Sequence, residues 1–233
     1  MAFINGKEVL FSGYGNIVVD ETAIYDVALN GGKRTNLEYA FNHWQMEYIR
    51  PPFVVKPTGR YLYVFSNNHK LKKIEKQYFD FSGCSTSYAS QATSGAFYTA
   101  YYCSNLEEFE DIGLPDGTYT STWGTCLKLR KIELVRSRKE TPFSSPFSQC
   151  VELEYIRFDG EIGQNISFSY SGKLSVESVI DILQHLADLT GESAKTITFH
   201  DDVKTRMAQQ GAIAELDGKT YDAYITDKGW NLA

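Results

Sequence analysis

The sequence predicts an α/β fold: a short repeat solenoid of about five coils, with an N-terminal β-hairpin head and a C-terminal αβ cap. Three observations predict it. A Cys-x-x-Leu-x-x-(Ile/Phe) frame occurs three times between residues 103 and 158, and its cysteines are 23 and 24 residues apart. An apolar residue stands three positions before each cysteine. After residue 174, apolar residues recur with helical spacing instead.

Composition and charge limit the function classes. The chain has 233 residues, 42% hydrophobic and 22% charged, which is ordinary for a globular protein long enough to bury a sizeable core. Its net charge of −6 argues against nucleic-acid binding, because a phosphate-binding surface needs clustered Lys and Arg in excess. The first residues lack the basic and apolar regions of a signal peptide, and no apolar run approaches the ~18 residues of a membrane span. We therefore expect neither classical secretion nor membrane insertion.

Three of the four cysteines occupy the same position in successive repeats. A small buried apolar position explains this placement, because Cys is among the most buried residue types. Stacked coils would hold equivalent side chains about 5 Å apart, which is wide for the Cβ separation of a disulfide. We therefore expect reduced thiols at Cys103, Cys126 and Cys150, whereas Cys84 lies outside the frame.

Residues 1–36 carry no repeat and form the predicted N-terminal head. Asn5-Gly6 between two apolar-rich runs is typical of a β-hairpin with a type I′ turn, whose two central residues have positive φ. A second strand-like run follows at residues 16–19, and residues 31–36 form a break before the repeats. The head could cap the solenoid or attach to another protein, and its own sequence favours neither.

Residues 37–172 form the predicted solenoid. With the cysteine position as zero, the equivalent positions are His43, Asn68, Cys103, Cys126, Cys150 and Ser171. The column three residues earlier consists of Ala40, Phe65, Ala100, Trp123, Phe147 and Phe168. The period breaks once, where 35 residues separate two zero positions and a Ser/Thr/Gly-rich insertion occupies residues 81–95. Insertions leave a solenoid as loops on one face, and this one is either a binding loop or a passive solvated loop.

Residues 173–233 form the predicted αβ cap, which covers the open end of the repeat core. Ser175 is expected to N-cap a helix whose apolar stripe ends near Gly191. Residues 195–200 alternate like a strand, and Asp201 or Asp202 begins a second helix that reaches about Gln210. A third helix over residues 220–228 and a short strand at 230–232 follow.

The repeat frame resembles a known family. Cys-x-x-Leu-x-x-Ile with an aromatic residue three positions upstream is similar to the BspA-like branch of bacterial leucine-rich repeat proteins. Further segments resemble leucine-rich repeat proteins encoded in phages and prophages of gut Firmicutes. They are residues 3–11, 33–41, 153–165, 174–180, 195–199 and 225–233. The chain departs from that family in a 12-residue excess near Cys84 and in a short head.

The resemblance implies a leucine-rich repeat solenoid in a virion-associated protein of the tail tip, fibre or baseplate. It brings no catalytic residues with it. The partners it implies are a host-surface protein or glycan, or other virion tail proteins. A homo-oligomer is compatible with this role, although no heptad or collagen-like stretch in the sequence encodes one.

The candidate partner-binding residues follow from the strand pattern and the tyrosine distribution. Outward-facing positions of stacked strands form one column with Tyr48, Lys73, Glu108, Lys131 and Tyr155, and a second column with Arg50, Glu75, Glu110, Glu133 and Arg157. Opposite charges in these columns either support the sheet or form a recognition surface. Tyr88, Tyr98 and Tyr101 lie in or near the serine-rich insertion, where tyrosine with small polar residues is typical of adaptable binding loops, although tyrosines also line turns without a ligand.

The sequence offers little catalytic or metal-binding chemistry. His200 with Asp201 and Asp202 is the best metal candidate, but an aspartate pair before a helix is more often an N-cap. Carboxylates are dense over residues 107–111, yet a flat strand surface does not form the cleft that a glycosidase needs. No nucleophile-elbow, phosphate-loop or dinucleotide-binding motif occurs. We therefore expect a non-enzymatic protein without cofactor or metal.

Two other functions use the same repeat class. One is a bacterial cell-surface adhesin, which would need an export signal. The other is an intracellular protein-binding scaffold, for example a phage protein that counters a host defence. The scaffold would need only the same outward surface.

Overall fold

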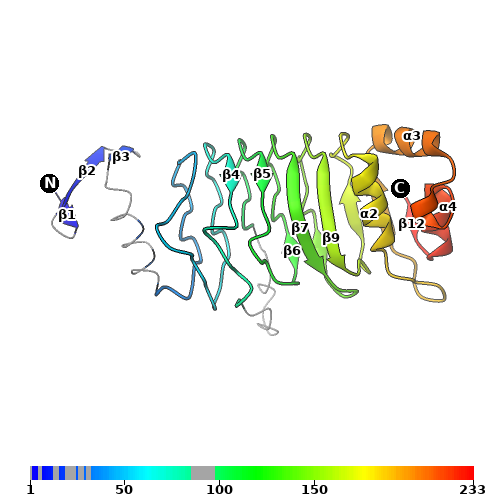
Figure 1. Cartoon of the computed structure of the whole chain (residues 1–233), viewed down its shortest axis with the longest axis horizontal. Coiled ribbons are helices and arrows are strands. Elements are labelled where there is room, and N and C mark those ends of the chain that lie inside the picture. Colours follow the sequence, from blue (N-terminus) through cyan, green and yellow to red (C-terminus); the bar gives the residue numbers. More distant parts are fainter. Residues whose placement is uncertain are drawn as a thin grey trace.

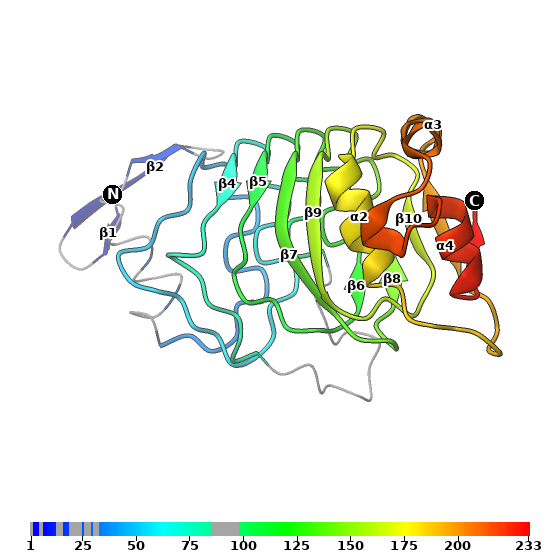
Figure 2. The ribbon, with the colours of Figure 1, turned by 45° about the vertical axis from the view of Figure 1, so that its right-hand side comes forward.

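The structure is a computed structural model, and it describes residues 2–4, 7–12, 16–18, 25, 29, 33–84 and 98–233. It is a mixed α/β structure with parallel β-sheets, and the three helices α2, α3 and α4 of the described residues lie in the C-terminal part of the chain. Successive turns of the chain lie side by side in sequence order along the long axis, and the helices gather at the C-terminal end (Figures 1 and 2).

The head contains a three-stranded antiparallel sheet. Strands β1 (Ala2–Ile4) and β2 (Lys7–Ser12) pair with Ile4 opposite Lys7, which confirms the predicted hairpin. Strand β3 (Asn16–Val18) pairs with the other edge of β2. The Asn5-Gly6 turn itself lies outside the described residues.

A four-stranded parallel sheet forms one face of the central region. Its strands are β4 (Lys73–Ile74), β5 (Glu108–Phe109), β7 (Lys131–Ser137) and β9 (Tyr155–Gly160), in that order. Each strand pairs with the equivalent residues of the next repeat, as the frame predicts. A two-stranded parallel sheet, β6 (Tyr119–Thr120) with β8 (Phe143–Ser144), joins the same repeats elsewhere.

The predicted cysteine column is a buried ladder. All four cysteines are free and buried, in agreement with the expectation of reduced thiols. Each repeat thiol donates a hydrogen bond to the carbonyl of the residue three positions before the preceding zero position. The pairs are Cys103 with Phe65 at 3.0 Å, Cys126 with Ala100 at 3.0 Å and Cys150 with Trp123 at 3.1 Å. Asn68 extends the ladder with a side-chain amide that donates to Phe41 O and Phe65 O.

Aromatic side chains stack through the core of the later repeats. The rings of Trp123, Phe147, Phe168 and Phe199 lie in one near-parallel series, with centroid distances of 5.5, 4.8 and 5.8 Å. All four side chains are buried. Because the last ring belongs to β11 (Thr196–Phe199), the core of the repeats continues without a break into the cap.

The predicted register is wrong in the first turn. Phe41, not Ala40, stacks on Phe65, with ring centroids 5.6 Å apart and planes 9° from parallel. His43 is exposed rather than buried, and its φ is +61°. Trp44 therefore holds the zero position of this turn.

The strand register nevertheless holds in the first coil. Tyr48 bridges Lys73 in parallel, as predicted. Only seven residues separate Phe41 from Tyr48, whereas eight separate Phe65 from Lys73. The first coil is thus one residue shorter between its turn and its strand.

Left-handed residues other than glycine recur at two positions in each of the first five turns. They lie five residues and one residue before the zero position, and they are Tyr39, His43, Tyr63, Asn67, Tyr98, Tyr102, Ser121, Thr125, Ser145 and Gln149. Each such residue costs free energy relative to an extended or helical conformation, so neighbouring turns must hold it in place. Backbone bonds between successive turns do so, for example from Thr125 N to Ser148 O at 2.7 Å.

The cap combines a parallel sheet with the helices. Strands β10 (Ile166–Phe168), β11 and β12 (Asn231–Leu232) form the sheet in that order. The helices are α2 (Val176–Gln184), α3 (Asp201–Gln210) and α4 (Tyr221–Asp227), with a 3₁₀ turn at Ala214–Leu216. The predicted strands and helices are present.

One predicted boundary in the cap is wrong. Helix α2 ends at Gln184 instead of near Gly191, because Leu186 leaves it to form a parallel bridge with Ile162. His185 is the C-cap, and the Lys228 ammonium donates hydrogen bonds to nearby carbonyls, of Gln184 at 3.2 Å and of Leu186 at 2.6 Å. Helix α3 begins at Asp201 and ends at Gln210, as predicted, and its N-cap is His200 rather than an aspartate.

Candidate functional site

The parallel sheet brings five of the predicted candidate residues into one row. Tyr48 pairs with Lys73, Lys73 with Glu108, Glu108 with Lys131 and Lys131 with Tyr155. We call this row, with the parallel row two residues later, the strand face. Strands about 4.8 Å apart hold neighbouring side chains of a row in contact.

Charges on the strand face are largely paired with one another. The Lys73 ammonium lies 2.8 Å from Glu108 and 2.7 Å from Glu110, and these hydrogen bonds raise the pKa of Lys73. Arg50 binds Glu75 at 2.6 Å in the second row. The predicted pairing of Lys73 with Glu108 is therefore confirmed, and it spans adjacent strands.

Lys131 behaves differently from Lys73. It is the register neighbour of Glu108, but its ammonium lies 5.5 Å from the ring centroid of Tyr155. Among the described residues, no carboxylate lies within 4.0 Å of it. Lys131 is thus a cation of the strand face that an external partner can reach without breaking an ion pair.

The second row continues into a bonded carboxylate network. The backbone N–H of Asp111 donates to Glu133 at 2.9 Å, and this bond, with the Lys76 ammonium, lowers the pKa of Glu133. Burial raises the pKa of Glu110, but the hydrogen bonds from Lys73 and from the Lys76 backbone N–H outweigh it, so that the pKa is lowered. These carboxyls are held ionised at neutral pH.

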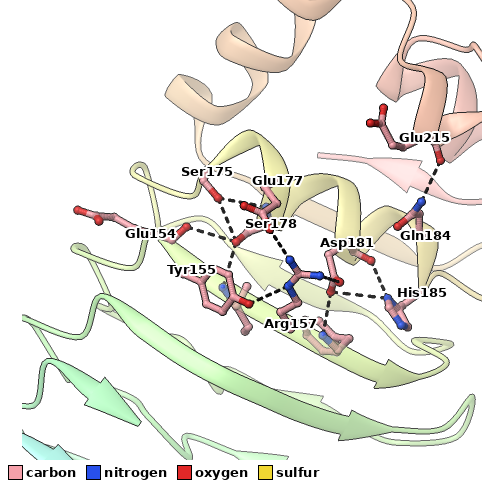
Figure 3. Close-up of polar contacts among 12 residues, drawn as sticks. Glu154, Tyr155, Arg157, Ser175, Glu177, Ser178, Asp181, Gln184, His185 and Glu215 are labelled. Carbon is pink, nitrogen blue, oxygen red and sulfur yellow. Dashed lines mark hydrogen bonds and ion pairs between the residues drawn. The ribbon is translucent and has the colours of Figure 1, made fainter. Parts of the chain in front are cut away.

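Tyr155 and Arg157 lie at the end of the strand face against helix α2 (Figure 3). Arg157 Nε donates to the Tyr155 hydroxyl at 2.8 Å, and its guanidinium also binds Glu177 and lies 3.5 Å from Asp181. Arg157 therefore ties the end of the strand face to the cap and also holds the Tyr155 hydroxyl.

Helix α2 also completes the hydrogen bonding of the last strand. The Ile156 N–H donates to Ser178 Oγ at 3.1 Å, and the Phe158 N–H donates to Asp181 Oδ2 at 2.8 Å (Figure 3). Two helix side chains thus replace the next strand of the sheet. The sequence analysis missed this role, although two buried polar residues on the apolar side of a helix are a signal that could have indicated it.

The remaining candidates lie elsewhere. Tyr98 and Tyr101 belong to the turns that precede the strands, where their rings meet edge to face with centroids 5.1 Å apart. Tyr88 and most of the predicted insertion lie outside the described residues. The candidate residues therefore do not form a single site.

The predicted metal candidate is a helix cap. His200 Nδ1 accepts the Asp202 N–H at 3.2 Å, and Asp201 pairs with Lys204 at 2.8 Å. Within the described part of the chain, no group of three or more His, Cys, Asp or Glu side chains could hold a metal ion. A shallow hollow of about 380 Å³ lies beside the strand face, lined by Glu107, Leu127, Lys128, Arg130 and Glu152.

Comparison with models of protein families, with curated proteins and with solved structures found no significant match. In the described regions, no helix has the length and apolar character needed to cross a membrane.

Proposed function

We propose that this protein is a non-enzymatic binding protein built as a short leucine-rich repeat solenoid of about five coils. A β head over residues 1–36 and an αβ cap over residues 173–233 enclose its ends. The observation that carries the proposal is the row of outward side chains from Tyr48 to Tyr155, held in register by parallel strands. Because the side chains are held before a partner arrives, little conformational entropy is lost on binding.

The strand face fits a protein or glycan partner. It carries tyrosine rings, cations and carboxylates in alternation, and most of its charges are already neutralised by neighbours. Such a surface attracts neither polyanions nor polycations strongly. Specific recognition instead depends on the tyrosines and on Lys131, which keeps its charge available.

The resemblance to phage-encoded leucine-rich repeat proteins favours a place in the virion. The protein is then a component of the tail tip, fibre or baseplate. There the strand face contacts a host-surface protein or glycan, or another tail protein.

The state of the carboxylates favours binding over catalysis. A general acid must hold its proton near the working pH, which requires a raised pKa. Glu110 and Glu133 have lowered pKa values, because hydrogen bonds from Lys73, Lys76 and the Asp111 backbone stabilise their ionised forms. These two carboxylates therefore stay ionised and contribute negative charge to the strand face rather than donating a proton.

The first test is whether the protein is part of the virion. Mass spectrometry of purified phage particles should detect this chain in stoichiometric amounts with the other tail proteins. Its absence from particles, when the protein is present in the lysate, would reject the virion assignment and leave the adhesin and the intracellular scaffold.

The second test concerns the strand face. Lys131→Ala should weaken binding of the purified protein to host cells or to tail proteins by about three- to tenfold, as expected for loss of one charged contact. Lys204→Ala is the matched control, because it removes the same charge from helix α3 in the cap. Equal binding by the two variants would reject the strand face as the contact surface.

A further inference from the structure

The turns that precede the strands form a surface without charged side chains. Each turn runs from five residues before the zero position to one residue after it. The six stretches are residues 39–45, 63–69, 98–104, 121–127, 145–151 and 166–172. None contains Asp, Glu, Lys or Arg, although these residue types make up 22% of the chain and about nine would be expected. We call this surface the turn ridge.

Exposed hydrophobic side chains gather on the turn ridge. Six large hydrophobic residues are exposed among those described, and five of them belong to these turns. The five are Tyr39 (54% exposed), Tyr102 (43%), Leu127 (41%), Val151 (42%) and Tyr170 (50%). Val54, the sixth, lies outside the ridge. Scattered hydrophobic residues on a surface need no explanation, whereas a series along one ridge marks an interaction site.

In the first half of the turn ridge, the tyrosine rings stack into one continuous cluster. Tyr63 stacks between Tyr39 and Tyr98, with ring centroids 4.9 and 4.8 Å apart. Tyr101 meets Tyr98 edge to face, and Tyr102 lies against Tyr101 at 5.8 Å. Backbone hydrogen bonds between turns continue this arrangement into the later repeats. The ridge is therefore a rigid, preformed surface.

The chemistry of the ridge favours a protein as its partner. The ridge residues themselves offer no counter-charge to a charged ligand, and the nearest charges line the hollow beside Leu127. Tyr63 offers no open ring face to a sugar, because the neighbouring rings cover both of its faces. Aliphatic side chains such as Leu127 and Val151, together with tyrosines and few charges, are instead typical of the centre of a protein interface.

The net charge of the molecule bears on which protein can bind the turn ridge. At −6, two copies of this chain repel one another, and the repulsion is smallest where an uncharged face meets an uncharged face. A two-fold axis pairs the same surface of both copies, so this surface only has to pack against its own copy without repulsion. The ridge meets it, since five intervals of about 4.8 Å give a surface about 24 Å long without a like-charge contact. We propose that the turn ridge is the contact surface between two copies of this chain.

This proposal concerns a different face from the strand face and is independent of the partner bound there. It is tested on the full-length chain by sedimentation equilibrium. The double variant Leu127→Glu/Val151→Glu places four carboxylates in the dimer contact and should weaken dimerisation about tenfold or more. Val54→Glu is the control, because it puts one such carboxylate at an equally exposed hydrophobic position off the ridge.

The expected result is a wild-type dimer, a double variant that is monomeric at the same concentration, and a control that remains dimeric. Unchanged thermal unfolding of the variants would show that they are folded. A wild-type protein that stays monomeric up to about 200 μM would overturn the proposal, because a specific contact of this kind should have a micromolar or lower Kd. So would a dimer that the double variant leaves intact, or a monomer whose ridge binds a neutral polysaccharide.

Discussion

Asp181 gives a quantitative test of how helix α2 stabilises the last strand. Its carboxylate accepts the buried Phe158 N–H at 2.8 Å and lies 3.5 Å from the Arg157 guanidinium. Asp181→Asn keeps an acceptor for the N–H and loses the charge that faces Arg157 and, at 3.7 Å, the His185 ring. Because Arg157 is 41% exposed, that loss should lower the free energy of unfolding by about 0.5 kcal/mol.

Asp181→Ala also leaves the Phe158 N–H without a partner. A buried unpaired donor costs about 1–3 kcal/mol, and the higher helix propensity of alanine returns about 0.5 kcal/mol. The alanine variant should therefore be about 1–3 kcal/mol less stable than the parent, and clearly less stable than the asparagine variant. For a chain of this length, that corresponds to a fall in Tm of about 2–10 °C.

The assay is urea unfolding, with hydrogen exchange at the Phe158 amide as a local measurement. Exchange should accelerate in Asp181→Ala and remain close to that of the parent in Asp181→Asn. Glu177→Ala is the control, because it removes an exposed partner of the same arginine without touching the strand. Equal stability of the alanine and asparagine variants would refute the argument that the helix side chain replaces a strand.

Three further predictions concern the repeats. Thr125→Asn should stabilise the protein by about 0.5–1 kcal/mol in thermal unfolding, because a β-branched residue at φ +62° is more strained than asparagine; a lower Tm would contradict this. Hydrogen bonds from Arg136 lower the pKa of Asp111, so their stabilisation is complete above the unfolded-state pKa of about 4 and is lost as the pH falls through the folded-state pKa. Arg136→Met should cost about 1 kcal/mol at pH 7 and nothing near pH 2, and a difference that persists in acid would exclude the ion pair as its cause. Burial raises the pKa of Cys103 and Cys150 to about 12, so thiol reagents should label these cysteines only after unfolding; rapid labelling of the native protein would show that the ladder opens.

The strand register was predictable because the period of the sequence specifies it. Every residue from Lys73 to Tyr155 in the first row lies opposite the neighbour that the frame assigns. Apolar residues at fixed offsets can be buried together only if the coils stack in that register. The local signals of the cap helices were also sufficient, since Ser175 accepts the Ser178 N–H as an N-cap should.

The errors arose where contacts distant in sequence decided the structure. Helical periodicity continues past Gln184, but pairing with Ile162 ends the helix, and no local signal shows where that partner lies. In the first turn, the repeat frame predicted a buried His43 because it assumed the same spacing between turn and strand as in the later repeats. The loss of one residue between turn and strand moved Phe41 into the aromatic column instead.

The two edges of the central sheet constrain how this molecule can associate. At the first edge, the Arg50 N–H donates to the Tyr25 hydroxyl at 2.7 Å. At the last edge, the N–H groups of Ile156 and Phe158 are bound by helix α2. Exposed strand edges normally invite pairing with another chain. Here the backbone N–H groups at both edges already donate to side-chain oxygens of the same chain. Association of copies end to end through the sheet would have to break those bonds, whereas contact through the turn ridge would break none of them. The capping of the edges thus favours a lateral dimer, in which the strand faces of both copies stay open to their partners.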